Sequence, residues 1–304
     1  MRVVVVGLGV QGHKRRTVAG DDAVATVDPV NPEAKYRRLE DVPFSSYDAA
    51  LVCTPDEAKI DLLTHLLSGG KHLLVEKPLF GSSQDLKKLK ALAERKGVTC
   101  YTAYNHRFEP HFVRMKELLD SGQLGRIYCI RMFYGNGTAR LVRDSAWRDK
   151  GAGVLPDLGS HLLDTVLFWL GKAVSGFRIY SASRFENRAF DHVAFGADAD
   201  PVLHFEVTLL SWRNHHYTDV LAEKGSAHIQ SLCKWGPSTF VVRDRKLPSG
   251  RPDEESVTLV QPDPTWALEY EHFKKLCDRG ENNIANDIWI NDTLRDLQSQ
   301  LPGC

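Results

Sequence analysis

The strongest constraint on the fold of this chain lies at its start, where the apolar run Arg2–Val6 is followed at once by Gly-Leu-Gly-Val-Gln-Gly at residues 7–12. Consecutive valines favour a strand that is buried on both faces. The glycines permit a tight turn after this strand, and the residues that follow predict a helix. A buried strand that turns directly into a helix is the first unit of a parallel α/β sheet.

Short apolar runs and helical patterns alternate in this way to about residue 105. Two segments, Asp56–Ser68 and Ser82–Lys96, carry apolar residues at the three- and four-residue spacing of a helix, and Gly97 is a suitable end for the second. The predicted strands are Arg2–Val6, Ala23–Val27, Tyr47–Cys53, His72–Val75 and Val98–Ala103. We therefore predict an α/β fold whose N-terminal part is a Rossmann domain with a doubly wound parallel sheet.

The second half of the chain has a different pattern. From Val174 to about Val260 it is a series of short strands, and residues 202–212 alternate apolar and polar side chains as a half-buried antiparallel strand does. The predicted helices of this half are Phe108–Ser121, Leu158–Leu170, Trp266–Arg279 and Ala285–Gln300. We expect a C-terminal α+β domain built on a mostly antiparallel sheet, and a division of the chain into residues 1–122 and 123–304.

Composition narrows the class of protein. The 304 residues contain 39 basic and 39 acidic side chains, so no basic surface for nucleic acid or an anionic membrane is expected. The six cysteines form no Cys-x-x-Cys pair, which argues against a disulfide framework or a zinc knuckle. No apolar stretch approaches the length of a membrane span, and the first residues do not resemble a signal peptide. We expect a soluble cytoplasmic protein without a metal.

The glycine motif at the first turn also predicts a ligand. It follows a strand, opens a helix, and is followed 21 residues after Gly7 by Asp28 at the end of the second strand. This is the context in which the glycines of a dinucleotide-binding site approach a pyrophosphate and an acid binds the ribose hydroxyls. A carboxylate disfavours a 2′-phosphate, so we expect NAD rather than NADP, although nearby basic residues leave NADP open. The expected contacts are Gly7, Gly9, Val10, Gln11, Gly12 and Asp28.

Two further segments follow predicted strands and so lie at the same carboxyl edge of the sheet, where ligands of such sheets bind. Thr54-Pro55 follows Cys53, and Glu76-Lys77-Pro78 follows Val75. Pro78 restricts the backbone of Lys77 and favours a reproducible direction for its side chain. Each segment also has a simpler interpretation, because Thr54-Pro55 is a common entry to a helix and a charged pair is a common solvated end of a strand.

Asp157 and His161 lie four residues apart at the start of a strongly apolar helix, within the segment GVLPDLGSHLLD at 153–164. A carboxylate beside an imidazole is suited to general-base catalysis. The same pair is compatible with half of a metal site, or with a capping aspartate and an unrelated core histidine. His215-His216 is not a metal pair, because neighbouring side chains of a strand point to opposite faces.

Taken together, these segments resemble one family. GLGVQG, Thr54-Pro55, VEKP at 75–78, YNHRF at 104–108 and GVLPDLGSHLLD occur in the order and spacing of the glucose–fructose oxidoreductase/inositol dehydrogenase/MocA family. The resemblance runs from residue 2 to about residue 280. It implies an NAD(P)-dependent oxidoreductase that acts on a secondary alcohol or ketone of a sugar, sugar nucleotide or cyclitol, and a homodimer or homotetramer formed through the C-terminal sheet.

The resemblance also assigns roles to residues. It implies that Lys77, Asp157 and His161 are catalytic, and it adds Glu76, Lys77 and Asn105 to the cofactor contacts with Thr54 and Pro55. The segments around Arg107 and Trp147-Arg148 are similar to the family's substrate-side loops. Lys59 stands where many relatives have a histidine, and either a pyrophosphate contact or a surface position is compatible with it. A non-catalytic sensor of the same fold, or a reductase of a conjugated non-sugar substrate, is the alternative function.

Overall fold

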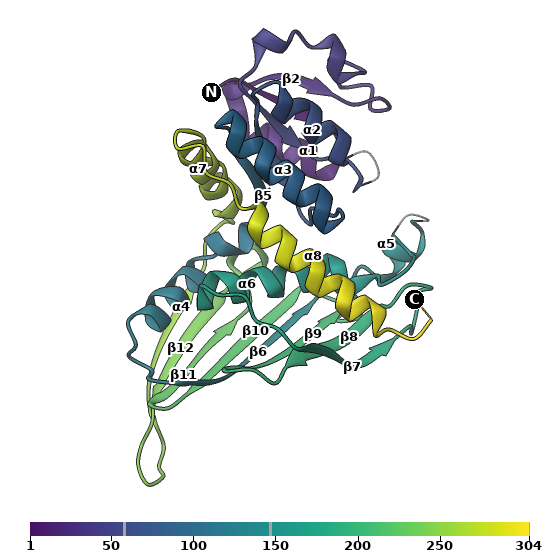
Figure 1. Ribbon diagram of the computed structural model, residues 1–304. Coiled ribbons are helices and arrows are strands. Elements are labelled where there is room, and N and C mark those ends of the chain that lie inside the picture. The colour runs from purple at the N-terminus through teal and green to yellow at the C-terminus, as the bar shows by residue number, and fades with distance from the viewer. Residues whose placement is uncertain (57–58, 146–147, 304) are drawn as a thin grey trace. The chain divides into compact units, whose positions relative to one another are not determined.

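The computed structural model describes residues 1–56, 59–145 and 148–303 of the chain. Contacts between Cα atoms divide it into two compact units (Figure 1). The first unit combines Met1–Asn105 with Thr265–Asn291, and the second runs from His106 to Pro264 and resumes at Asp292. None of the helices formed by the described residues is both long enough and apolar enough to cross a bilayer.

The first unit is built on a five-stranded parallel sheet in the order β2-β1-β3-β4-β5. Its strands are β1 (Val3–Val6), β2 (Ala23–Val27), β3 (Ala49–Val52), β4 (His72–Glu76) and β5 (Cys100–Ala103). Because β2 and β3 pair with opposite sides of β1, the strand order reverses at the end of β1. That reversal is the topological switch point at which doubly wound sheets bind their ligands.

Helices cover this sheet, and their ends follow from the sequence. They are α1 (Val10–Ala19), α2 (Lys59–Ser68), α3 (Ser83–Lys96), α7 (Thr265–Cys277) and the first half of α8 (Ile284–Ser299). The Ser82 hydroxyl accepts the backbone N–H of Asp85 and caps α3, and Gly97 ends that helix in the left-handed conformation, so both expected ends are confirmed.

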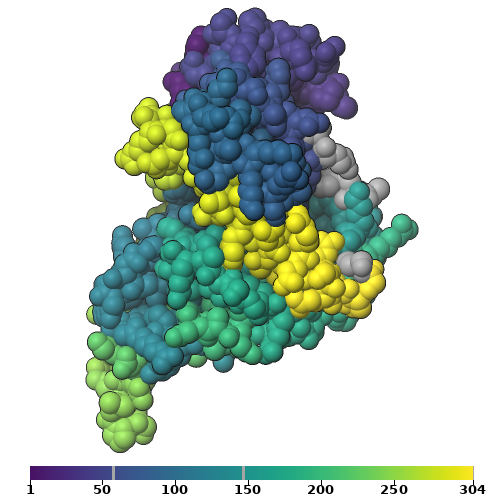
Figure 2. All heavy atoms as spheres, viewed as in Figure 1, coloured from purple at the N-terminus to yellow at the C-terminus, as the bar shows by residue number. Residues whose placement is uncertain are grey.

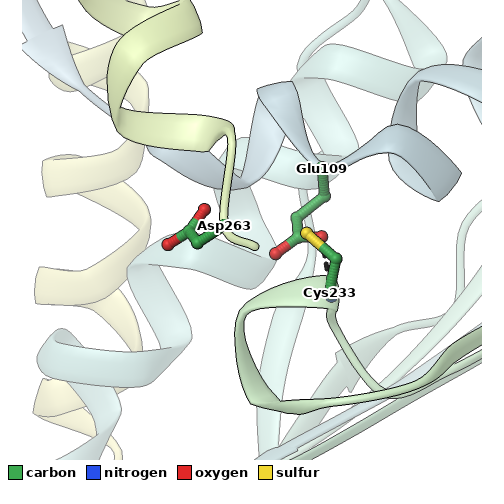
Figure 3. Close-up of side chains that lie close together, drawn as sticks. All are labelled: Glu109, Cys233 and Asp263. Carbon is green, nitrogen blue, oxygen red and sulfur yellow. Dashed lines mark hydrogen bonds between the residues drawn. The ribbon is translucent and has the colours of Figure 1, made fainter. Parts of the chain in front are cut away.

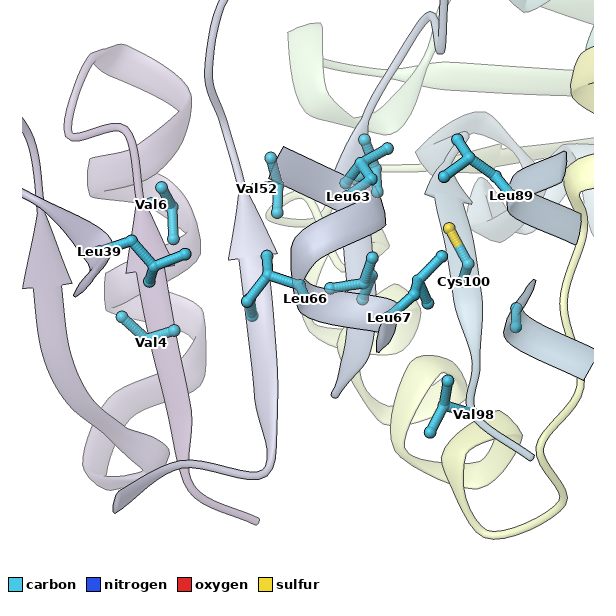
Figure 4. Close-up of a cluster of buried hydrophobic side chains, with 14 of the residues drawn as sticks. Val4, Val6, Leu39, Val52, Leu63, Leu66, Leu67, Leu89, Val98 and Cys100 are labelled. Carbon is cyan, nitrogen blue, oxygen red and sulfur yellow. The ribbon is translucent and has the colours of Figure 1, made fainter. Parts of the chain in front are cut away.

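Apolar side chains fill the space between the sheet and α2 and α3 (Figure 4). Leu63, Leu66 and Leu67 of α2 are fully buried and belong to the same apolar cluster as Val4 and Val52 of the sheet. A separate apolar cluster brings α7 into this unit, with Tyr270, Phe273 and Cys277 beside residues of β1, β3, β4 and β5. The predicted Rossmann fold is therefore confirmed, and a helix from the end of the chain completes it.

The compact units differ from the division expected from the sequence at 1–122 and 123–304. Residues 106–122 belong to the second unit, and α7 and the first half of α8 belong to the first. The physical reason is the packing of α7 on the parallel sheet, together with hydrogen bonds such as the one from the Thr102 hydroxyl to Asp287 Oδ2 at 2.8 Å.

The second unit is built on an eight-stranded sheet in the order β13-β12-β11-β10-β6-β9-β8-β7. Only the β6–β9 pair is parallel among the pairs of this sheet in the described chain, so the expected mostly antiparallel sheet is confirmed. The strands are β6 (Ile127–Gly135), β7 (Phe177–Ser183), β8 (His192–Ala197), β9 (Val202–Thr208), β10 (His215–Ala222), β11 (Gly225–Gln230), β12 (Ser238–Asp244) and β13 (Asp253–Leu259).

One face of this sheet carries the helices α4 (Pro110–Asp120) and α6 (Ser160–Leu170), and α5 (Ala139–Arg143) lies near its end (Figure 1). Along β10, buried His216, Thr218 and Val220 alternate with more exposed residues of the opposite face. The hairpin between β12 and β13 projects beyond the rest of the unit, drawn in light green in Figure 2. Edge strand β13 is exposed and begins with three acidic residues, which is how natural sheets protect an edge.

The helix expected at Leu158–Leu170 begins earlier than predicted. A π-helical turn, η6 (Leu155–Gly159), leads into α6, and Gly171 ends the helix in the left-handed conformation. Pro156 lies in the first turn of η6, where its missing N–H has no helical partner to lose. Asp157 and His161 are therefore joined by a π-helical turn rather than by continuous α-helix.

Candidate active site

The first turn of the Rossmann unit leaves room for a ligand where the glycine motif predicts it. A Cβ atom on Gly7, whose φ is +90°, would come within 2.6 Å of the Cys53 carbonyl oxygen. A side chain on Gly12 would collide with the backbone of Gly7. Gly9 behaves differently, because no atom lies within 4 Å of its hypothetical Cβ among the described residues. The turn is thus closely packed at Gly7 and Gly12 and open at Gly9, as a backbone that receives a pyrophosphate must be.

Asp28 lies beside this turn and orders its backbone. Its carboxylate accepts N–H groups from Leu8 at 2.7 Å, Val30 at 2.9 Å and Asn31 at 2.8 Å. Burial opposes ionisation, but these bonds, with the charge of Arg37, lower the pKa of Asp28 below its ordinary value. A carboxylate has about four acceptor positions, so three protein N–H groups leave capacity for a ribose hydroxyl.

Thr54 and Pro55 follow β3 at the same edge of the sheet. The Thr54 hydroxyl is buried and has no hydrogen-bond partner in the described part of the chain. A buried polar group without a partner is costly, and a bound ligand would satisfy it. Pro55 is exposed beside it. Val10 and Gln11, the other expected contacts, are exposed at the start of α1.

Lys59 is not a surface residue, so the surface position that the sequence left open for it is wrong. It is 2% exposed, and its Nζ lies 2.6 Å from Asp56 Oδ1 and 3.5 Å from the carbonyl oxygens of Glu76 and Pro78. The lysine therefore holds the backbone on both sides of Lys77. The contact of Lys59 with a pyrophosphate stays a prediction.

Glu76 faces the interior of the first unit. Its Oε1 accepts Nε of Arg15 at 2.6 Å, and Nη2 of Arg15 lies 2.8 Å from Glu269 Oε2 on α7. Burial disfavours the charged form of Arg15, yet the carboxylates of Glu269 and Glu76 hold its pKa above the ordinary value. The ring of Trp266 also lies over the guanidinium, 4.3 Å from its centre. Glu76 is thus fixed as a structural partner of α1 and α7, while Lys77, at the next position, is partly exposed.

Asn105 is the last residue of the N-terminal segment of the first unit. Its Nδ2 donates to the Thr265 hydroxyl at 2.9 Å, and the residue is buried. This bond joins the end of the segment after β5 to the first residue of α7. The expected contact of Asn105 with a cofactor stays a prediction.

His161, the candidate general base of the second unit, lies in the first turn of α6 and is 6% exposed. Its ring stacks on that of His106 with centroids 4.1 Å apart and planes 20° apart. The ring of Tyr134, on β6, meets it edge to face at 5.7 Å. The contacts with these two rings restrict the orientation of the His161 imidazole, as proton transfer in a fixed direction requires.

The remaining expected residues of this unit are joined by ion pairs. Arg148 Nη2 lies 3.5 Å from Asp157 Oδ2, with both side chains partly exposed. Arg107 donates hydrogen bonds from Nε and Nη2 to the buried carboxylate of Asp164, at 2.8 and 2.6 Å. Burial raises the pKa of Asp164 and Arg107 opposes that rise, so the arginine has a structural partner on α6. Trp147 lies outside the described residues.

Glu109, Cys233 and Asp263 form the one group of three metal-ligating side chains found among the described residues, with ligand atoms within 4.8 Å of one another (Figure 3). Glu109 Oε2 accepts the Cys233 backbone N–H at 3.1 Å. Burial raises the pKa of Glu109 and of the Cys233 thiol, and the ammonium of Lys234 lies close enough to oppose both shifts. A divalent cation would be repelled by that ammonium group, so we interpret the cluster as an anchor for the turn at Cys233.

Sequence reasoning missed several of these residues. Arg15 shares a buried face of α1 with Gly12 and Ala19, and that three- and four-residue spacing was the available signal. His106 lay within a quoted motif but was given no role. Lys234 lies in a short turn after β11, and no local pattern predicts its contact with an imidazole 128 residues earlier in the chain.

Comparison with known proteins identifies the family. Residues 1–104 match the family described as "Oxidoreductase family, NAD-binding Rossmann fold", and residues 112–228 match the GFO/IDH/MocA C-terminal domain. The chain is 24% identical to the scyllo-inositol 2-dehydrogenase (NAD(+)) of Bacillus subtilis, over 95% of this chain and 89% of that protein. It is 30% identical to the NADP(+) enzyme of the same name from that organism over 133 residues, which are 42% of this chain and 37% of the relative's length.

The fold has solved counterparts. A levoglucosan dehydrogenase in complex with NADH superposes with a TM-score of 0.82 over 99% of this chain and 96% of that chain, at 16% sequence identity. This likeness concerns the fold. The two matched domains follow one another in the order of the family and together cover more than half of the 304 residues. The chain therefore belongs to the GFO/IDH/MocA oxidoreductase family and carries that family's NAD-binding Rossmann domain.

Proposed function

We propose that this protein transfers a hydride between a nicotinamide dinucleotide and a secondary alcohol or ketone of a sugar, sugar nucleotide or cyclitol. Two observations, one in each unit, support the proposal. One unit has a glycine turn that is open at Gly9 and lies beside Asp28. The other has a buried imidazole, His161, held by stacking. The dehydrogenase names of the relatives in Bacillus subtilis support the substrate class.

Each candidate catalytic residue has a defined task. When bound, the nicotinamide supplies the hydride acceptor or donor. His161 accepts the hydroxyl proton while the carbon loses its hydride, and in the reverse direction it returns that proton to the carbonyl oxygen. Lys77 donates a hydrogen bond to the reacting oxygen and stabilises its negative charge. Asp157 offsets the charge of the protonated imidazole. Arg107, Arg148 and Trp147 are proposed on the substrate side, and Asn105 on the cofactor side.

We propose NAD as the preferred cofactor. The Asp28 carboxylate would lie where NADP carries its 2′-phosphate, and its lowered pKa keeps it ionised near neutral pH. Arg37, which could neutralise such a phosphate, donates to the Asn31 carbonyl oxygen at 2.7 Å. NAD should therefore raise the thermal midpoint of the protein more than NADP does at equal concentration. A larger stabilisation by NADP would contradict this preference.

Turnover provides the decisive test. The purified protein, with NAD and a panel of sugars, sugar nucleotides and cyclitols, should produce NADH with at least one of them. We expect Lys77→Met and His161→Asn to lower kcat by about 10²–10⁴-fold and to retain cofactor stabilisation. Wild-type rates in either variant would refute its assigned role. Cofactor binding without turnover on the whole panel would instead support a non-catalytic sensor.

We further propose a homo-oligomer formed through the outer face of the eight-stranded sheet. On that face Phe133 and Tyr217 are paired across β6 and β10, and their rings stack with centroids 5.2 Å apart. Both rings are partly exposed, which suits an interface. Light scattering should report a dimer or tetramer, and Tyr217→Glu should shift it toward monomer. The described cysteines are free thiols, which fits the cytoplasmic location we propose.

A further inference from the structure

Lys234 reaches the candidate base of the second unit through a single intervening ring. Its Nζ lies 3.0 Å from Nε2 of His106, and His106 stacks on His161 with ring centroids 4.1 Å apart. Both imidazoles are almost fully buried, whereas Lys234 is partly exposed. An ammonium group is therefore directed at one end of a stacked imidazole pair.

The chemistry of the two groups determines the direction of this hydrogen bond. A lysine ammonium has three donors and no acceptor, so Nε2 of His106 accepts, and a neutral His106 carries its proton on Nδ1. A second proton on His106 would occupy Nε2 and face the ammonium group. This hydrogen bond therefore favours the neutral form of the imidazole that stacks on His161.

The turn that carries Lys234 is fixed from two sides. Glu109 Oε2 accepts the backbone N–H of the preceding Cys233 (Figure 3). The ring of the following Trp235 packs on Tyr134, with centroids 5.7 Å apart, and Tyr134 in turn contacts His161. The 3₁₀ turn η7 (Cys233–Trp235) therefore has contacts on both sides of Lys234, and these contacts fix the backbone that carries the ammonium group.

Two carboxylates close to His161 in the sequence are already paired. Asp164 is bonded to Arg107 through both oxygens, at 2.6 and 2.8 Å. Asp157, in the turn before α6, has Arg148 at 3.5 Å. Each carboxylate therefore has an arginine beside it, and the charge of Asp157 also acts on Tyr134, whose pKa it helps to raise.

Of the other titratable groups around the pair, Tyr134 and His216 are uncharged near pH 7, whereas the carboxylates of Glu109 and Asp263 lie beside the turn that carries Lys234. Burial raises the pKa of Tyr134, and burial with the charge of Lys234 lowers the pKa of His216 to about 3. The ring of His216 lies 6.4 Å from that of His106, so the field of Lys234 already acts within this cluster. Burial also raises the pKa of Glu109, which weakens the carboxylate that could offset Lys234.

We propose that Lys234 is a positioning residue for His161: through His106, its ammonium group keeps the stacked imidazoles uncharged and aligned, so that His161 can accept a proton. A catalytic role for Lys234 rests on the proposed function. The effect of the Lys234 charge on His161, however, is a property of the protein without substrate. Because a nearby positive charge disfavours the protonated form, removing the charge should raise the pKa of His161.

The test is a histidine NMR titration of the full-length protein. The signal of His161 is assigned by its loss in His161→Asn, and its pKa is measured in wild type, Lys234→Met, Lys234→Gln and Lys234→Arg. Both neutral variants should raise the pKa of His161 by about one unit. Glutamine keeps a hydrogen-bond donor, so it separates the charge from the bond. Arginine keeps the charge and should leave the pKa near that of wild type.

Lys172→Met is the matched control, because Lys172 follows the other end of α6 and is exposed. It should leave the titration of His161 unchanged. An unchanged pKa of His161 in both neutral variants, with the fold retained, would overturn the proposal. This result does not depend on turnover: an inactive protein that shows the shift refutes only the proposed function. In an active protein, the acid limb of kcat/KM should move to higher pH in the same two variants.

Discussion

Arg15 shows how one charged residue can hold three elements of the first unit. Its guanidinium contacts Glu76 at the end of β4 and Glu269 on α7, and it is 1% exposed. Buried charges are stable only when they are paired, and removal of one partner leaves the others uncompensated. The segment that carries Lys77 therefore depends on a residue 62 positions earlier in the chain.

We expect Arg15→Met to lower the free energy of unfolding of the protein by about 3–5 kcal/mol, because it strands two carboxylates in the interior. Arg16→Met is the matched control, since Arg16 is the exposed neighbour on the same helix. Urea unfolding of both variants measures the difference. Adding Glu76→Gln and Glu269→Leu to Arg15→Met should recover part of the loss. Equal stability of the Arg15 and Arg16 variants would show that the ion pairs contribute little.

Strand β10 illustrates what an element's sequence does and does not predict. The rule that neighbouring side chains of a strand face opposite sides excluded a metal site at His215-His216, and the structure places His216 inside and His215 on the outer face. The two faces of this strand were therefore predictable from the two-residue alternation of its side chains alone. The partners of His216 were not, because Phe112 and Tyr134 come from other elements and their rings meet it only after folding.

The same limit applies to the candidate site. The glycine turn and the strand ends are local patterns, so their positions followed from the sequence. The stacking of His106 on His161 and the approach of Lys234 join residues from three elements, and no local spacing encodes them. Polar contacts between distant residues depend on how the elements pack, whereas the ends of helices and strands depend mainly on the local sequence.

His216 gives β10 a testable pH dependence. Burial lowers its pKa to about 3, well below the ordinary value of 6.5. Below pH 6.5 the unfolded chain binds a proton that the folded chain does not, so stability contributed by the neutral ring is lost as the pH falls from 6.5 toward 3. His216→Gln cannot titrate. The stability difference between wild type and this variant should therefore shrink on acidification, by at most about 1.4 kcal/mol per pH unit.

Urea unfolding at several pH values between about 7 and 4.5 measures this change in slope. His204→Gln, on the exposed face of β9, is the control, and its pH dependence should follow that of wild type. A stability difference for His216→Gln that stays constant across this range would show that the buried ring is protonated in the folded state as readily as in the unfolded one.

At the scale of the whole molecule, the chain leaves the first unit at Asn105 and returns to it at Thr265. The sequence predicted each element of this return, including two helices near the end, but it assigned both to the second domain. Amphipathic helices do not specify which sheet they cover, so their placement depends on matching apolar surfaces. Tyr270 and Phe273 meet such a surface on the parallel sheet.

Because helices from the end of the chain complete the first unit, we predict that residues 1–122, the domain expected from the sequence, will not fold stably alone. The fragment lacks α7, which covers Val3, Val5 and Leu51, and it lacks Glu269, which pairs with Arg15. It should show a broad urea transition and bind an apolar dye. Met1–Asn105 joined by a flexible linker to Thr265–Asn291 restores both contacts and should unfold cooperatively, with a midpoint that NAD raises. A fragment of residues 1–122 that unfolds as cooperatively as the linked protein would show that the parallel sheet is complete without its C-terminal helices.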